Sequence, residues 1–219
     1  MGRVFQTIVV LAMSTAAYPV MGERPHIQLT QNQKFAACVV HEDRVGSDAL
    51  VRSEPATDAE DRFFSVLAKA IERCDGQTGD DGLFPRRAMF RGMLAERLWL
   101  DGVWAFGGSA NTPVDPNKID FDKGFDSAPA LRDNYRLSFC LAYTRPELID
   151  QLLRTNEQSP EEAKFFEALS TDISHCLPVG RSVSLDRRWL RASLAEQLYR
   201  RYPPAPRFQS RSAALLKGK

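Results

Sequence analysis

The sequence has little net charge and lacks the motifs that mark the common classes of nucleotide-dependent and hydrolytic enzymes. It carries 29 basic and 28 acidic residues, so no strong field for nucleic acid or an anionic membrane is expected. It contains no phosphate-binding glycine loop, no G-x-G-x-x-G, no G-x-S-x-G and no H-E-x-x-H. We therefore expect no nucleic-acid partner and no cofactor.

Long apolar runs are also scarce. The run at residues 4–17 follows Arg3 and precedes a polar stretch that begins at Glu23, which is typical of a secretory signal peptide. A buried first helix or a membrane anchor is the alternative, but the run is shorter than the ~20 residues that span a bilayer. We expect residues 1–22 to be removed on export, leaving a periplasmic or secreted protein without net charge or a stable membrane span.

The sequence has only four cysteines, and their spacing repeats. Cys38 and Cys140 lie 102 positions apart, and so do Cys74 and Cys176. An even number of cysteines in an exported protein favours disulfides. Of the three possible pairings, duplication favours Cys38–Cys74 with Cys140–Cys176, because each half could then fold alone. Each bridge would stabilise the fold by about 4 kcal/mol on the chain-entropy estimate.

The segments around these cysteines repeat as well. Residues 56–74 and 87–100 pair with residues 158–176 and 187–200, and 12 of the 33 positions are identical. Chance identity would give about two. Two copies are too few for an open solenoid. We therefore expect two tandem repeats packed with pseudo-twofold symmetry.

The duplication predicts the domain organisation. We expect one globular domain over residues 23–202. Within it, the first repeat spans residues 35–100, a linker spans residues 101–131 and the second repeat spans residues 132–202. A proline-rich stretch then stops helix formation, so residues 203–219 are expected to be a flexible tail.

An all-α fold is predicted from the spacing of apolar residues. The clearest helix in each repeat begins at a capping box, Thr57-x-x-Glu60 or Ser159-x-x-Glu162. Its apolar residues recur at helical spacing on one face. We expect these helices to end at the second cysteine of each repeat.

The signals for the other helices differ in strength along the chain and between the two repeats. The last helix of each repeat is expected at about residues 86–100 and 187–201. Short apolar runs at residues 35–40 and 137–143 fit either helix or strand. Another capping-box pattern, at residues 144–147, predicts a further helix start in the second repeat. We therefore expect about three helices per repeat.

Arg91 and Arg191 are the main polar candidates. On a helical wheel each falls among core positions, and an unpaired buried charge is costly. We expect structural pairing, with a ligand-anchoring arginine pair as the alternative. Glu96 and Glu196 recur on the far flank of the same helices, so the arginines' partners are expected elsewhere.

Glu96 and Glu196 also supply the one catalytic hypothesis. Glycoside hydrolysis uses two carboxylates, and two copies of one residue could converge across a pseudo-dyad. Salt-bridged or surface glutamate is the plainer interpretation. A periplasmic hydrolase with these residues in an inter-repeat cleft is therefore the alternative function.

Metal sites are not expected. His41 lies near Cys38, and His175 precedes Cys176, spacings that zinc sites and nucleophile–base pairs also show. Neither histidine belongs to the repeat, so disulfides with surface histidines are preferred. Residues 120–126 resemble a calcium loop but lack the distal glutamate.

The order of these motifs resembles an uncharacterised family of exported bacterial helical proteins with an internal duplication. In residues 137–199 a cysteine is followed by Leu-Leu-Arg-Thr, Ser-x-x-Glu, a second cysteine and Leu-Arg-x-x-Leu-Ala-Glu-x-Leu-Tyr. Residues 35–99 carry the same order, with Phe90-Arg91-Gly92 and Trp99 as variants. The resemblance implies export and duplication, and no activity.

The function expected from the sequence is a binding or interaction module whose partner is an envelope protein or a small ligand. Residues present in both repeats are mostly core positions, cysteines and caps, which packing needs. Unique polar residues gather in the linker at 101–131, where Trp104 and Phe106 offer a surface for a partner.

Overall fold

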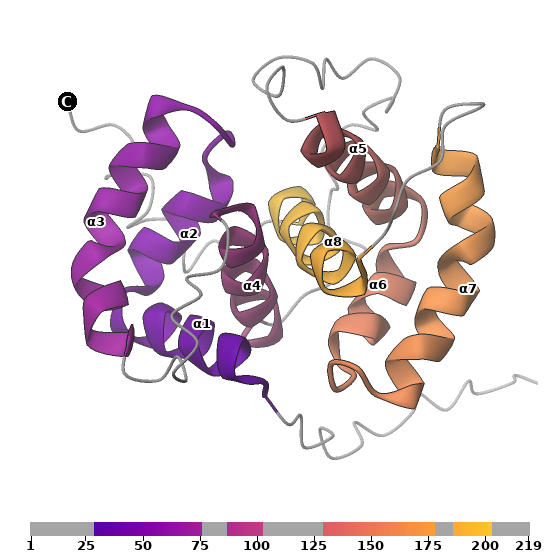
Figure 1. Ribbon diagram of the computed structural model, residues 1–219, viewed down its shortest axis with the longest axis horizontal. Helices are drawn as coiled ribbons and strands as arrows, with labels where there is room; N and C mark the ends of the chain where they lie inside the picture. Colours follow the sequence, from indigo (N-terminus) through magenta and orange to yellow (C-terminus); the bar gives the residue numbers. More distant parts are fainter. Residues whose placement is uncertain (1–28, 76–86, 103–128, 178–185, 203–219) are drawn as a thin grey trace, which may run out of the picture.

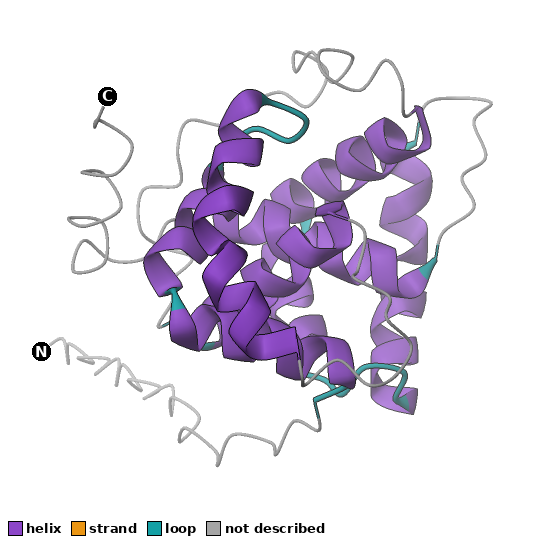
Figure 2. Ribbon diagram, turned by 60° about the vertical axis from the view of Figure 1, so that its left-hand side comes forward, coloured by secondary structure: helices purple, strands orange, loops and turns teal. Residues whose placement is uncertain are grey.

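The computed structural model describes residues 29–75, 87–102, 129–177 and 186–202 of the chain. Within these ranges the secondary structure is entirely helical, with eight helices and no strand (Figure 2). The all-α prediction is confirmed for this part of the chain. The helices are α1 (Gln31–Glu42), α2 (Arg44–Arg52), α3 (Asp58–Cys74), α4 (Arg87–Leu100), α5 (Pro129–Thr144), α6 (Pro146–Leu153), α7 (Pro160–Cys176) and α8 (Arg187–Arg201).

Each half contains four helices where about three were expected. The additional helix in each half is the first one, which lies where the sequence fitted either helix or strand. The segment after the first cysteine of each half forms the short helices α2 and α6. In the first half, Asp43 caps α2 by accepting from the backbone N–H of Gly46 at 2.8 Å. The segments that fitted either helix or strand lie in α1 and α5.

The first helix begins earlier than the predicted start of the first repeat at Phe35. Thr30 and Gln33 form a reciprocal capping box at its N-terminus. The Thr30 hydroxyl accepts from the Gln33 backbone N–H at 3.4 Å, and the Gln33 side chain accepts from the Thr30 backbone N–H at 3.0 Å. This box satisfies two otherwise orphaned donors and extends α1 to Gln31.

The capping boxes predicted at the N-termini of α3 and α7 form in part: the hydroxyl caps are present, but each glutamate binds a different backbone N–H from the one predicted. The hydroxyls of Thr57 and Ser159 accept from the backbone N–H three residues on, at 3.4 and 3.1 Å. The glutamate of each box instead accepts from the residue before the cap, Ala56 or Gln158, at 2.8 Å. Ala56 and Gln158 have φ of 58° and 63°. The carboxylate therefore holds a left-handed residue in place before each helix.

The capping box predicted at residues 144–147 is wrong. Thr144 is the last residue of α5, and its hydroxyl donates back to the carbonyl of Cys140 at 3.0 Å. The N-cap of α6 is Arg145, which makes no side-chain cap. Pro146 at the first helical position starts α6 instead, because its missing N–H costs nothing there.

The centre of the molecule is the crossing of α4 and α8. Figure 1 shows these two helices side by side, with α1–α3 flanking α4 and α5–α7 flanking α8. Within each half, the first two helices contact the central helix, and α3 or α7 lies outermost. Apolar side chains from both halves form one buried core around this crossing.

The two central helices approach most closely at Gly92. A Cβ added to Gly92 would lie 2.3 Å from the carbonyl oxygen of Ala192 and 2.6 Å from its Cβ. Ala192 is the residue aligned with Gly92 in the second repeat. The crossing thus brings the same position of each repeat into contact and requires a residue without a side chain on α4.

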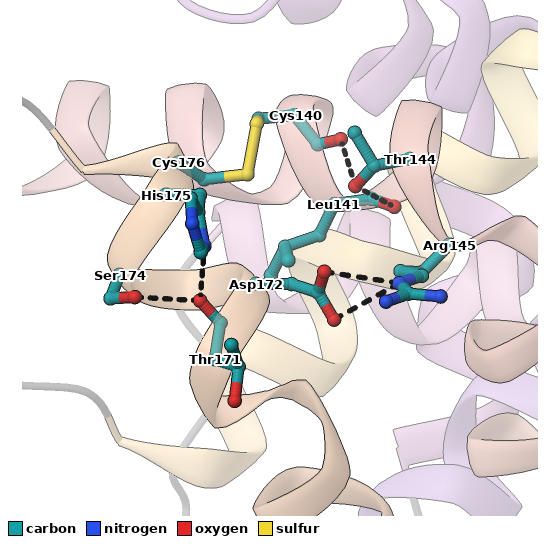
Figure 3. The surroundings of a disulfide bond; sticks show 9 residues. All are labelled: Cys140, Leu141, Thr144, Arg145, Thr171, Asp172, Ser174, His175 and Cys176. Atoms are coloured by element: carbon teal, nitrogen blue, oxygen red, sulfur yellow. Dashed lines mark hydrogen bonds and ion pairs between the residues drawn. A yellow bond between two sulfur atoms is a disulfide. The ribbon is translucent and has the colours of Figure 1, made fainter.

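Each half is closed by its own disulfide, as the duplication predicts. Cys38–Cys74 joins α1 to α3, and Cys140–Cys176 joins α5 to α7 (Figure 3). Both bridges connect residues 36 positions apart. They tie the outermost helix of each half to a helix that contacts the centre, so each bridge stabilises one half independently.

Several expectations fall outside the described residues. The signal peptide at 1–22, the linker residues 103–128 and the tail at 203–219 are among them. The described helix α5 begins at Pro129, within the predicted linker. No helix in the described ranges is long and apolar enough to cross a bilayer.

The close crossing predicts the effect of Gly92→Ala. We expect this variant to lower the free energy of unfolding by about 1–3 kcal/mol, because the added methyl meets backbone that cannot move without separating α4 from α8. Urea unfolding followed by circular dichroism measures the change. Helix propensity alone would make alanine more stable than glycine by up to about 1 kcal/mol, so a stabilised variant would contradict the crossing.

Candidate functional site

Arg91 is fully buried on α4, and its donors are all occupied. Its guanidinium donates to one carboxylate oxygen of Glu196 on α8, at 2.7 and 3.2 Å. It also donates to the hydroxyl and carbonyl of Ser53 at 3.0 and 2.8 Å, and to the carbonyl of Val51 at 3.2 Å. Glu60, the glutamate of the α3 cap, accepts at 3.3 Å. One arginine therefore joins α4 to the α2–α3 connection and to α8.

Arg191 on α8 makes the same set of contacts with the aligned residues. It donates to Glu96 on α4 at 2.8 Å and to Glu162, in the α7 cap, at 2.8 Å. It also donates to the carbonyls of Leu153 and Thr155 at 2.9 and 3.0 Å. The buried arginine of the second half thus fixes the α6–α7 connection as Arg91 fixes that of the first half.

The two ion pairs run between the halves of the molecule, and we call such contacts exchanged because each joins a residue of one half to a residue of the other. Each arginine binds the glutamate of the other central helix, so Arg91 pairs with Glu196 and Arg191 with Glu96. Burial and pairing of both arginines, predicted from the helical wheel, are confirmed. Within one helix the arginine and glutamate stand five residues apart on different faces, which is why the partner comes from the facing helix.

The second oxygen of Glu196 and the carboxylate of Glu96 are also bound. Glu196 accepts from the hydroxyl of Tyr135 at 2.7 Å, and Glu96 accepts from the side-chain amide of Gln33 at 3.0 Å. Gln33 and Tyr135 occupy aligned positions, 102 residues apart. Burial, followed by the charge of Glu196, raises the pKa of Tyr135 well above its usual value. The hydroxyl therefore remains a donor to the carboxylate.

A second pair of exchanged contacts connects the central helices to α2 and α6. The Trp99 indole on α4 donates to Asp150 on α6 at 2.8 Å, and the Tyr199 hydroxyl on α8 donates to Asp48 on α2 at 2.5 Å. Each aspartate also pairs with an arginine four residues on. These contacts place Trp99 and Tyr199 between the two halves.

Asp48 and Asp150 were missed at the sequence level. Both recur at the same 102-residue offset as the cysteines, and that offset was the available signal. They lie in α2 and α6, and the sequence shows a clear apolar pattern for this helix in the second repeat only. Periodicity alone therefore did not select the two aspartates. A polar residue repeated at the cysteine offset therefore marks an internal contact here.

The central network leaves little for acid–base chemistry. Glu96 is 4% exposed and Glu196 is fully buried, and both carboxylates are engaged by arginine on the opposite helix. Every N–H of both guanidinium groups has an acceptor within the protein. Burial opposes the charge of Arg91 and Arg191, but the carboxylates outweigh it and raise the pKa of each. These four groups are the centre of a buried set of ion pairs that also includes Glu60 and Glu162, and Arg200 approaches Glu196 at 3.6 Å.

The cysteine–histidine pairs do not form a chemical site. Cys176 is held in a disulfide, and the ring of the exposed His175 lies 2.8 Å from the carbonyl of Thr171 (Figure 3). Cys38, near His41, is likewise in a disulfide. Over the described ranges there is no group of three His, Cys, Asp or Glu side chains that could hold a metal. The calcium-like segment at residues 120–126 lies outside those ranges.

A groove between α7 and α8 is a further candidate that sequence reasoning missed. Its volume is about 470 Å³. Glu96 and Glu196 do not line it. It is lined by Ala163, Lys164, Phe166, Glu167, Ile173, Arg187 and Leu190. The available signal was a difference between the repeats: Ala163 aligns with Asp61, and Leu190 aligns with Phe90.

No family model, curated protein or solved structure matches the chain. The two repeats are therefore the available comparison for each other. Aligned residues that make the same contact identify the scaffold, and aligned residues that differ identify where the halves have diverged.

The buried network predicts a large effect of Arg191→Ala. We expect a loss of about 3–5 kcal/mol in the free energy of unfolding, because Glu96 and Glu162 would be left buried without their cation. Chemical denaturation measures it. The matched control is Arg87→Ala, because the ion pair of Arg87 with Asp61 has both side chains 60% exposed and is worth at most about 1 kcal/mol. Equal losses in the two variants would contradict the buried pairing.

The buried tyrosines predict instability at alkaline pH. Burial, then the charge of Asp48, raises the pKa of Tyr199, as burial and Glu196 do for Tyr135. A tyrosine whose pKa is higher in the folded than in the unfolded protein contributes its full stabilisation below the unfolded pKa of about 10. That contribution to the free energy of unfolding is lost as the pH rises from there toward the folded pKa. We expect unfolding free energy to fall above about pH 10, and to fall less steeply in Tyr135→Phe. Parallel profiles for the two proteins would contradict this prediction.

Proposed function

We propose that the protein is an exported binding module whose two repeats form a rigid scaffold with pseudo-twofold symmetry. The observation that carries the proposal is the exchanged network at α4 and α8. The charged residues repeated there, Arg91, Glu96, Arg191 and Glu196, are buried and bonded to one another across the two helices. Recognition then falls to positions where the repeats differ.

Export is supported by two independent features. The leader-like segment at residues 1–22 has the pattern of a secretory signal. Two disulfides close the helical halves, and structural disulfides persist in oxidising compartments. A periplasmic or secreted location fits both features, as does the resemblance to exported duplicated proteins.

The hydrolase alternative receives less support. A general acid or nucleophile must touch its substrate. Glu196 is instead fully buried, and its carboxylate is bound by Arg91 and Tyr135 with Arg200 at 3.6 Å. Catalysis by Glu96 or Glu196 would require the central ion pairs to open. A binding role requires no such opening.

The proposal is tested by capture and turnover in parallel. Mature protein, residues 23–219, is immobilised with its disulfides intact and exposed to an envelope extract, and bound proteins and small molecules are identified by mass spectrometry. We expect specific retention of an envelope component and no turnover of glycan or ester libraries. Turnover that is abolished by Glu96→Gln or Glu196→Gln in a folded variant would overturn the binding role in favour of the hydrolase.

A further inference from the structure

We propose that the groove between α7 and α8 binds a small amphiphilic monoanion, a free carboxylic acid with an apolar chain or ring. This inference rests on the proposed binding function and assigns it a site. The floor of the groove is apolar, formed by Phe166, Ile173 and Leu190, of which Phe166 is 8% and Leu190 3% exposed. Its volume of about 470 Å³ falls in the range of small-molecule sites, about 300–1,000 Å³.

The charges at the rim favour an anion. Lys164 on α7 and Arg187 on α8 are exposed and line the groove, with Glu167 as the single acidic lining residue. Arg187 has no ion pair with any described residue, and its contact there is with the Phe166 ring, at 5.9 Å. The neighbouring Asp186 is occupied as the N-cap of α8, accepting from two backbone N–H groups. One negative group can therefore be bound between the two cations.

At the equivalent position of the first half, the protein itself supplies a carboxylate for the aligned arginine. There Arg87, aligned with Arg187, forms an ion pair with Asp61. Its guanidinium lies 5.0 Å from the ring centre of Phe64, and that ring lies 6.0 Å from Phe90. Carboxylate, guanidinium and two aromatic rings thus occupy the position between α3 and α4 that corresponds to the groove.

The second half lacks two of these parts. Ala163 stands where the first half has its aspartate, and Leu190 stands where it has Phe90. The first change leaves Arg187 without a counterpart of the carboxylate that pairs with Arg87, and the second replaces a ring with a smaller side chain at the floor. A bound carboxylic acid would replace both missing parts, with its carboxylate at Arg187 and Lys164 and its apolar portion on Phe166 and Leu190.

The test uses full-length mature protein with intact disulfides and dodecanoate as the probe. Isothermal titration below the micellar concentration compares dodecanoate with dodecylamine, dodecanol and vesicles of anionic phospholipid. We expect saturable binding of dodecanoate and at least about tenfold weaker binding of the amine and the alcohol. Binding of the amine as tightly as the acid, binding to vesicles alone, or no binding of the acid would overturn the proposal.

The decisive variant restores the first-half arrangement. Ala163→Asp places a carboxylate where Asp61 stands, and we expect it to weaken dodecanoate binding at least about tenfold, or 1.4 kcal/mol. The exposed substitutions Arg187→Gln and Lys164→Gln should weaken binding as well and do not depend on folding of Ala163→Asp. The matched control is Arg87→Gln in the first half, which should bind as wild type does.

The outcomes separate this site from the broader function. If Ala163→Asp binds the acid as wild type does, with an unchanged circular dichroism spectrum, the groove is not the site. If wild type binds no acid but still retains an envelope component, and Ala163→Asp retains it too, the groove proposal fails while the binding module stands. If wild type retains nothing and binds no acid, both proposals fail.

Discussion

The exchanged ion pairs between α4 and α8 are the constraint on which the rest of the structure depends. A buried charge is tolerated only when its geometry is fully satisfied, so Arg91 and Arg191 fix more than the two helices that carry them. Arg91 holds the backbone at Val51 and Ser53 and the cap glutamate of α3. Arg191 does the same around α6 and α7. The close approach at Gly92 lets both pairs form at once.

This constraint also separates scaffold from function. The repeated polar residues are bonded within the molecule, and the disulfides close each half separately, so both halves keep one framework. The groove between α7 and α8 lies at positions where an aspartate and a phenylalanine of the first half have been replaced, and none of the four central charged residues lines it. Divergence of one copy can therefore create a binding site without disturbing the central ion pairs.

Much of the fold could be predicted from the sequence, because duplication shows each signal twice. The helices at 58–74, 160–176, 87–100 and 187–201, the disulfide pairing and the buried arginines all followed from spacing. The backbone N–H that each cap glutamate binds was predicted one residue too late in the chain, because the actual donor is a left-handed residue that periodicity does not reveal. The partners of Arg91 and Arg191, and the groove, depend on how two helices face each other. One helix's pattern defines its own buried face, but it does not identify the residue opposite.

The most direct measurement is a double-mutant cycle between Arg91 and Glu196, on helices of different halves. Unfolding free energies are compared for wild type, Arg91→Ala, Glu196→Gln and the double variant. We predict a coupling energy of about 1–3 kcal/mol, as for contacting residues. The control cycle pairs Arg91→Ala with Arg73→Ala on the exposed face of α3 and should be additive within about 0.5 kcal/mol. Additivity of Arg91 and Glu196 would contradict the account, because the halves would then not be joined by this ion pair.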